Sequence, residues 1–254
     1  MSQPAEGEPR PAPGSSQGQP HQEPATRSTH RSRSLLRESA AVLVTAIVLS
    51  LLIKTVLVQA FFIPSASMEP TLHGCETCVG DRVLVNKLTT HTGGVHRGDI
   101  VVFHDPGGWL PQASLTSGLQ SRVHDALAII GLAPSSNDSD LIKRIIGVGG
   151  DTVEGRGGQV YVNGAQLKEP YVFPGNSPSK VDFRVTVPFG KLWVMGDHRS
   201  NSSDSRFHMQ DPGNGFVPMK DVVGRAFVIV WPLDRVGSLD TPATFDRLGV
   251  SAAR

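Results

Sequence analysis

The sequence predicts a mainly β body that follows a single apolar N-terminal helix. From Pro64 onward, short runs rich in Val and Ile recur and are separated by Gly, Pro and Asn, a pattern typical of strands joined by turns. Asn163-Gly164, between the runs YV and AQL, is a strong signal for a two-residue hairpin turn. Long amphipathic helices do not alternate with the runs, which argues against a βαβ arrangement. The expected strands cover residues 82–85, 99–103, 142–148, 159–162, 183–187, 191–195 and 222–230.

The chain begins with a polar tail and continues into an apolar run. Residues 1–37 are rich in Pro, Gly, Ser, Gln and Glu, a composition typical of disorder. The end of this tail is basic, with Arg27, Arg31, Arg33 and Arg37. From Ala40 to Ile63 the residues are almost all apolar, with Lys54 as the single charge. Because about 20 helical residues cross the hydrocarbon core of a bilayer, we predict a transmembrane anchor at 38–62.

The arginines before the apolar run predict its orientation. By the positive-inside rule, the N-terminus lies in the cytoplasm and the chain after about residue 64 lies outside the cell membrane. Two alternatives stay open, a buried core helix and a cleaved secretory signal, although the run is longer than a usual signal sequence. The extracytoplasmic body is then expected at 63–235, with a C-terminal tail at 236–254.

Residues 106–140 interrupt the strand pattern. The segment is rich in Gly, Ser and Pro at both ends and has one short helical stretch near 119–130. Connections of this length are usually functional or disordered. Two interpretations are open: a surface insertion near the membrane, where Trp109 would suit the interface, and a plain flexible loop.

Composition excludes several functional classes. A formal net charge of +1 and 6% aromatic residues argue against nucleic-acid binding. The two cysteines, Cys75 and Cys78, exclude a disulfide-dense scaffold and a four-cysteine zinc site. We expect no metal and no cofactor. Outside the membrane, Cys75 and Cys78 are expected to form a local disulfide, while a zinc or redox role lacks further ligands or the matching fold.

One serine and one lysine are candidates for nucleophilic chemistry. Ser67 lies between Pro64 and Pro70, and these prolines favour a rigid turn. A serine hydroxyl needs an adjacent base to become a good nucleophile. Lys143 lies in the strand-like run IKRIIGV, where alternation sends Lys143 and Arg144 to opposite faces, so that one of them should point inward. A buried lysine loses its charge readily and can act as a base, whereas arginine stays protonated.

Four segments follow one another along the chain: IPSASMEPTL (63–72), RGDIVVF (97–103), IKRIIGVGGD (142–151) and GDHRSNSSDSR (196–206). In this order they resemble the characteristic segments of bacterial type I signal peptidases. The resemblance covers residues 39–232, and the insertion and the stretch HGCETC are similar to actinobacterial members. It implies a signal-peptidase-like (LexA-like) β-barrel or sandwich that carries the catalytic site and stands on a single transmembrane helix.

The resemblance also implies catalytic roles. Ser67 would be the nucleophile, and Lys143 would take its proton as general base and return one to the leaving amine. The Ser65 hydroxyl and the Ser67 backbone N–H would form the oxyanion hole, the set of donors that stabilises the tetrahedral intermediate.

Four further residues would support this pair. Ser202 would hydrogen-bond the Lys143 amine and orient it. Asp204 would form a supporting salt bridge, with Arg206 as partner, and Asp197 would help to hold the same loop. All four lie in the last of the matching segments.

The implied activity is the removal of N-terminal signal peptides from secreted preproteins after small residues of the A-x-A type. The expected partners are these preproteins, the lipid bilayer and, by proximity, the secretion translocon. Three alternatives stay open: a catalytically inactive membrane-tethered β domain, another Ser-Lys peptidase with a dedicated substrate, and a Ser-His-Asp hydrolase. The last lacks a G-x-S-x-G elbow, and its adjacent pairs His104-Asp105 and His124-Asp125 do not form a triad by adjacency.

Overall fold

The computed structural model describes residues 29–75, 78–89, 94–110 and 140–246. Most of the predicted tail at 1–37, most of the insertion and the end of the C-terminal tail therefore lie outside the described residues. The first element is helix α1, Thr29–Val56. Within the described ranges, no helix combines the length and the apolar character that crossing a membrane requires.

The apolar run contains a helix and a strand. Helix α1 ends at Val56, and strand β1, Val58–Phe62, pairs antiparallel with β2, Arg82–Asn86. The expected anchor at 38–62 is thus helical only in its first part. Val and Phe favour strands once a pairing partner is present, and Phe61 is buried in the core of the β body, so tertiary pairing decides the conformation here.

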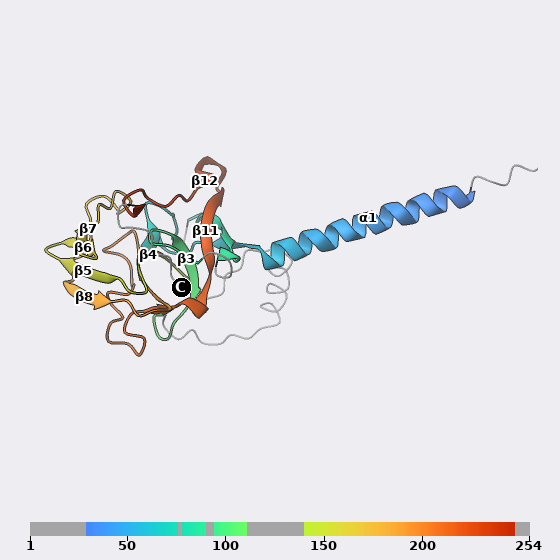
Figure 1. The fold of residues 1–254 in the computed structure, drawn as a ribbon. Helices are drawn as coiled ribbons and strands as arrows, with labels where there is room; N and C mark the ends of the chain where they lie inside the picture. The colour runs from blue at the N-terminus through green and yellow to red at the C-terminus, as the bar shows by residue number, and fades with distance from the viewer. Residues whose placement is uncertain (1–28, 76–77, 90–93, 111–139, 247–254) are drawn as a thin grey trace, which may run out of the picture. The chain divides into compact units, whose positions relative to one another are not determined.

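The main sheet carries most of the body. Its order is β1-β2-β11-β3-β4-β9-β10, with β12 paired to β11. Every strand pair in it is antiparallel. The central strands β3, β4 and β11 lie side by side in Figure 1. The elements beyond β2 are β3, Ile100–His104; β4, Asp140–Val148; β9, Lys191–Met195; β10, Val217–Pro218; β11, Val222–Trp231; and β12, Gly237–Ser238.

A smaller antiparallel sheet has the order β7-β6-β5-β8 and gathers at one end of the β body in Figure 1. Asn163 and Gly164 join β6 to β7 with φ of 52° and 81°, so the hairpin expected from this dipeptide is present. Its strands are β5, Thr152–Arg156; β6, Gln159–Val162; β7, Ala165–Gln166; and β8, Phe183–Thr186. Two short 3₁₀ turns, η2 at Met219–Asp221 and η3 at Leu233–Arg235, flank β11.

The prediction of a mainly β body is confirmed. Every expected strand is present, with limits that differ by at most about two residues, which is the usual uncertainty of strand ends. Strand β4 lies between β3 and β9, and its residues enter three core clusters, through Ile142, Ile145 and Ile146. The main sheet is therefore covered on both faces along β4, and this cover removes water from the polar side chains of that strand.

The interface role considered for Trp109 is wrong. This side chain is only 7% exposed, and it packs edge-on against Phe103 and stacks on His208. An aromatic ring with these neighbours belongs to the core cluster of β3 and β4 and is not available to lipid.

Candidate active site

Ser67 lies on a short helical turn that apolar neighbours hold in the core. The turn, η1, covers Ala66–Met68 and follows β1. Met68 and Leu72 are fully buried together with Phe61, and the Leu72 N–H donates to the Met68 carbonyl at 3.0 Å. The apolar positions of the segment SASMEPTL thus fix the turn, and Ser67 itself is buried on it.

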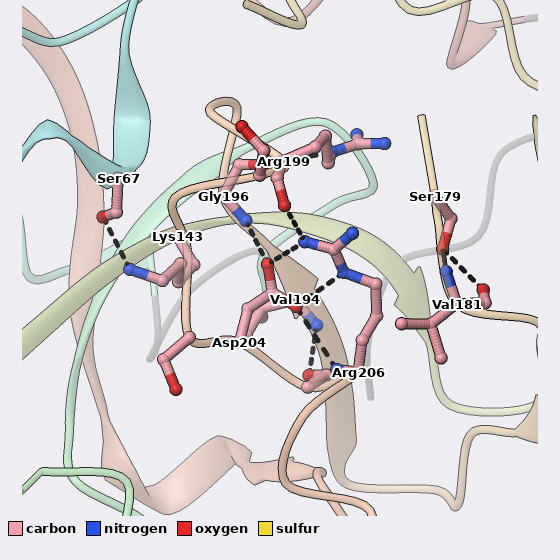
Figure 2. Close-up of polar contacts among 12 residues, drawn as sticks. Ser67, Lys143, Ser179, Val181, Val194, Gly196, Arg199, Asp204 and Arg206 are labelled. Atoms are coloured by element: carbon pink, nitrogen blue, oxygen red, sulfur yellow. Dashed lines mark hydrogen bonds and ion pairs between the residues drawn. The ribbon is translucent and has the colours of Figure 1, made fainter. Parts of the chain in front are cut away.

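Lys143 projects from β4 to Ser67. Its Nζ donates to Ser67 Oγ at 2.8 Å and to the Ile142 carbonyl at 3.0 Å, and Figure 2 shows the first of these bonds. The side chain is 3% exposed. Burial lowers the pKa of Lys143 from its ordinary value of 10.5 to about 8, although the negative charges of Asp204 and Asp197 act in the opposite direction. A neutral amine is therefore accessible near neutral pH, in contact with a serine hydroxyl.

Ser65 brings a second hydroxyl to the same place. Its Oγ lies 3.2 Å from Ser67 Oγ, and its backbone is extended, with φ −128° and ψ 152°. Ser65 is solvent-exposed while Ser67 is buried. The nucleophile thus lies between an exposed serine, Ser65, and a buried lysine, Lys143.

Arg144, the neighbour of Lys143, is also buried, so both residues point into the protein. Its guanidinium binds Asp197 in a bidentate manner, at 2.9 and 2.7 Å, and donates to the Gly98 carbonyl at 2.7 Å. Thr71, four residues after the nucleophile, donates its hydroxyl to the same carboxylate at 2.5 Å. Asp197 thereby joins β4 to the segment that carries Ser67.

Asp204 and Arg206 form a second buried pair. Arg206 donates to both carboxylate oxygens at 2.8 Å, and the Gly196 N–H donates to Asp204 at 3.0 Å (Figure 2). Burial alone would raise the pKa of Asp204, but the Arg206 guanidinium, the Gly196 N–H and the Ser202 hydroxyl together outweigh it and hold this pKa below its usual value. Asp204 is therefore a fixed negative charge beside Lys143, and it favours the protonated amine.

Ser202 does not form the bond that we expected with Lys143. Its Oγ is buried and has no hydrogen-bond partner among the described residues. Its hydroxyl contributes to lowering the pKa of Asp204, but without regular hydrogen-bond geometry. A Cβ added to Gly196 would lie 2.3 Å from Ser202 Oγ and 2.5 Å from the Ser67 carbonyl oxygen. Gly196 thus lets the loop with Ser202 approach the nucleophile segment closely.

A family model described as "Signal peptidase, peptidase S26" matches residues 36–231, which include every part of this site. The chain belongs to the signal peptidase family, peptidase S26. The family predicted from the four segments is thereby confirmed.

The family relatives include proteins from several bacterial groups. Signal peptidase I of Mycobacterium tuberculosis is 44% identical over 223 residues, which cover 81% of this chain and 76% of that protein. Signal peptidase I of Leptolyngbya laminosa is 36% identical, covering 89% and 94%. A crystal structure of a signal peptidase I from Enterococcus faecalis covers 52% of this chain and 95% of its own, at 28% identity and a TM-score of 0.33, too low to inform the fold.

Sequence reasoning missed further buried ion pairs that brace this S26 peptidase. Arg97 and Asp151, from the second and third matching segments, bind through Nε at 2.6 Å, and both are buried. Glu169 pairs with Arg199 and accepts the Tyr171 hydroxyl at 2.8 Å. The sequence shows that these residues are charged, but it does not say which opposite charge each of them meets.

The structure also assembles a Ser-His-Asp array that we did not expect. His208 Nε2 lies 2.8 Å from Ser203 Oγ, and His208 Nδ1 lies 2.6 Å from Asp211 Oδ2. Ser203 is exposed, while His208 is buried against Trp109. The adjacent His-Asp pairs in the sequence do not indicate this array, because its partners lie five residues before and three residues after the histidine.

Cys75 and Cys78 lie close together. Their sulfur atoms are 2.22 Å apart and their Cα atoms 5.4 Å apart. Within the described ranges, no group of three or more His, Cys, Asp or Glu side chains is placed to hold a metal ion. A disulfide between these two cysteines stays a prediction. A free-thiol count that found two reactive thiols in the folded, non-reduced protein would contradict it.

Proposed function

We propose that this chain is a serine endopeptidase that removes N-terminal signal peptides from secreted preproteins, with Ser67 as nucleophile and Lys143 as general base. The observation that carries the proposal is the 2.8 Å contact between Lys143 Nζ and Ser67 Oγ in a buried setting that lowers the pKa of the amine to about 8. A base must lie within hydrogen-bond reach of the proton that it takes, and its pKa should lie near the working pH. Both conditions are met here.

The proposed reaction passes through an acyl-enzyme. Ser67 Oγ attacks the scissile carbonyl carbon while its proton moves to neutral Lys143, and the resulting ammonium then protonates the leaving amine. Water next attacks the ester carbonyl, gives a proton to Lys143, and releases the acid as Ser67 recovers its proton. The Ser67 N–H and the Ser65 hydroxyl stabilise the oxyanion in both steps. Asp197, Asp204 and Arg206 hold the loop around the site. The Ser202 hydroxyl lies in the same loop and helps to keep Asp204 negatively charged.

We propose further that the protein is membrane-anchored through α1, with the N-terminus in the cytoplasm. Four arginines, Arg27, Arg31, Arg33 and Arg37, lie in the twelve or so residues before the apolar run. The large apolar side chains between Val42 and Leu49 are 50–70% exposed. The β body also exposes Trp231, Leu233 and Val236 around the end of β11, an apolar set suited to a lipid surface. Anchoring would place the enzyme beside membrane-bound preproteins and the translocon, and raise their effective concentration.

The deciding experiment is cleavage of an A-x-A preprotein by wild type and Ser67→Ala in detergent. We expect cleavage by Ser67→Ala to fall by at least about 10³-fold, because loss of the nucleophile leaves only binding and oxyanion stabilisation. A thermal unfolding curve close to that of wild type is the control for folding. Normal turnover by Ser67→Ala would refute the proposed mechanism, and absence of cleavage by wild type would favour an inactive domain. A preprotein with a bulky residue at −1 tests the substrate class.

The Ser203 array defines the competing prediction. If it carried peptide hydrolysis, Ser203→Ala would abolish cleavage and Ser67→Ala would not. We expect the reverse: Ser203→Ala should keep its turnover within about twofold of wild type. Ser203 has no part in the proposed reaction of Ser67 and Lys143, and loss of an exposed hydroxyl in a loop changes the stability of the fold little. His208→Gln, which interrupts the same array at its base, is the matched second variant in the preprotein assay.

A further inference from the structure

His198 binds the segment of Ser67 at two points. It follows Asp197 in the loop after β9, and its backbone N–H donates to the Ser67 carbonyl at 3.1 Å. Its ring Nδ1 lies 3.2 Å from the carbonyl oxygen of Ala66. One residue thus contacts the carbonyl groups on both sides of the nucleophile's Cα.

The contact with Ala66 acts on the peptide unit that matters for the oxyanion. The Ala66 carbonyl and the Ser67 N–H belong to the same planar peptide group and point in opposite directions. A donor that fixes the direction of this carbonyl therefore fixes the direction of the Ser67 N–H. The Glu69 N–H also donates to the Ala66 carbonyl, at 3.1 Å, so this oxygen is held from two sides.

The surroundings of His198 fix its ring. The ring stacks on Phe173 with centroids 4.0 Å apart and planes 9° apart, and the Phe173 N–H donates to the Asp197 carbonyl at 3.0 Å. The carboxylate of Glu69 lies 3.8 Å from Nδ1. A carbonyl oxygen only accepts hydrogen bonds, so Nδ1 carries the hydrogen in this contact. Nδ1 carries it in the neutral ring and in the protonated ring alike.

We propose that His198 is a positioning residue that aims the Ser67 N–H at the oxyanion through the Ala66 carbonyl. This inference rests on the proposed function, because it needs Ser67 to be the attacking group. His198 does not exchange a proton with the substrate. Its contribution appears in the transition state, where the oxyanion forms, and it is small in substrate binding.

Two variants separate the hydrogen bond from the packing. His198→Phe keeps an aromatic ring on Phe173 and removes the donor. His198→Asn loses the ring but keeps a side-chain nitrogen donor three bonds from Cα, as Nδ1 is. With an A-x-A peptide in detergent, we expect His198→Phe to lower kcat about tenfold with KM within about twofold, since a misdirected donor costs less than a deleted one. We expect His198→Asn to stay within about threefold of wild type.

The pH profile is the second measurement. Because His198 acts on the oxyanion donor and not on the lysine, the midpoint of kcat against pH should be the same in both variants as in wild type. Normal kcat in His198→Phe would overturn the proposal, and so would an equal loss in both variants or a shifted midpoint. Ser67→Ala in the same assay keeps the two ideas apart. If it stays active, the proposed function fails; if it is inactive while His198→Phe is normal, only the role of His198 fails.

Discussion

Lys143→Met is expected to abolish cleavage at every pH and, at neutral pH, to make the protein more stable. The loss of activity follows because methionine cannot take the proton of Ser67. In wild type, cleavage should rise with pH through about 8, the pKa to which burial lowers the Lys143 amine. Cleavage that appeared only near 10.5, the ordinary lysine value, would contradict a desolvated base.

The gain in stability comes from the same burial. A fall of the Lys143 pKa from 10.5 to about 8 corresponds to about 3 kcal/mol at roughly 1.4 kcal/mol per pKa unit. Below pH 8 both the folded and the unfolded chain hold the proton, so the folded state bears the full cost. Between about 8 and 10.5 the unfolded chain binds more protons, so the free energy of unfolding of wild type rises with pH.

Chemical denaturation at pH 7 and at pH 10 measures this effect. Lys143→Met should gain up to about 3 kcal/mol over wild type at pH 7, less the two hydrogen bonds of the amine, and most of that gain should disappear by pH 10. Lys143→Arg is the matched control, because it keeps a charge that does not titrate. It should be inactive and no more stable than wild type. Equal stability of Lys143→Met and wild type at pH 7 would show that the amine is hydrated.

Asp204→Asn is expected to act on stability and on the pH profile together. The substitution leaves the Arg206 guanidinium buried without a negative partner, and breaking a buried ion pair from one side costs about 3–5 kcal/mol. Asp204 also favours the protonated form of Lys143. Its neutralisation should therefore move the midpoint of cleavage below about 8, the value to which the Lys143 pKa is set in wild type.

The matched control is another acidic residue in an ion pair. Glu154 binds Arg184, whose side chain is 73% exposed, and exposed pairs contribute about 0–1 kcal/mol. Glu154→Gln should therefore leave both the unfolding free energy and the midpoint nearly unchanged. An upward shift of the pH midpoint of cleavage in Asp204→Asn would contradict the prediction. So would a shift no larger than that of Glu154→Gln, because either result would mean that the charge of Asp204 does not act on Lys143.

Much of the fold could be predicted because alternation and turn signals are local. The Asn163-Gly164 hairpin and β9 were placed correctly from adjacent residues alone. Strand β1 was missed because Val58–Phe62 continues an apolar helix without a break in composition. Only its pairing with β2 distinguishes it, and that pairing is tertiary information.

The site was predictable in its members and not in all of its contacts. Ser67 and Lys143 are 76 positions apart, so the family resemblance, and no spacing rule, brought them together. The ion-pair partners of bracing residues such as Arg144 and Arg199 were missed, because a charged residue does not reveal in the sequence which opposite charge it meets. His198 was missed for another reason: its ring acts on a backbone carbonyl, and backbone acceptors leave no trace in a sequence.

The order of the segments along the chain has a consequence for biosynthesis. Ser67 lies near the start of the β body, Lys143 follows on β4, and β9, which pairs with β4, comes later still, with the loop to Arg206 after it. Until β9 and that loop have been translated and have folded, the burial that lowers the pKa of Lys143 from 10.5 to about 8 is incomplete, so we expect the amine to stay protonated at neutral pH. A nascent chain that already contains both reactive groups is thus expected to be inert, and proteolytic capacity should arise only once translation has passed the far side of the domain. The fold itself would delay the enzyme, with no propeptide needed to do so.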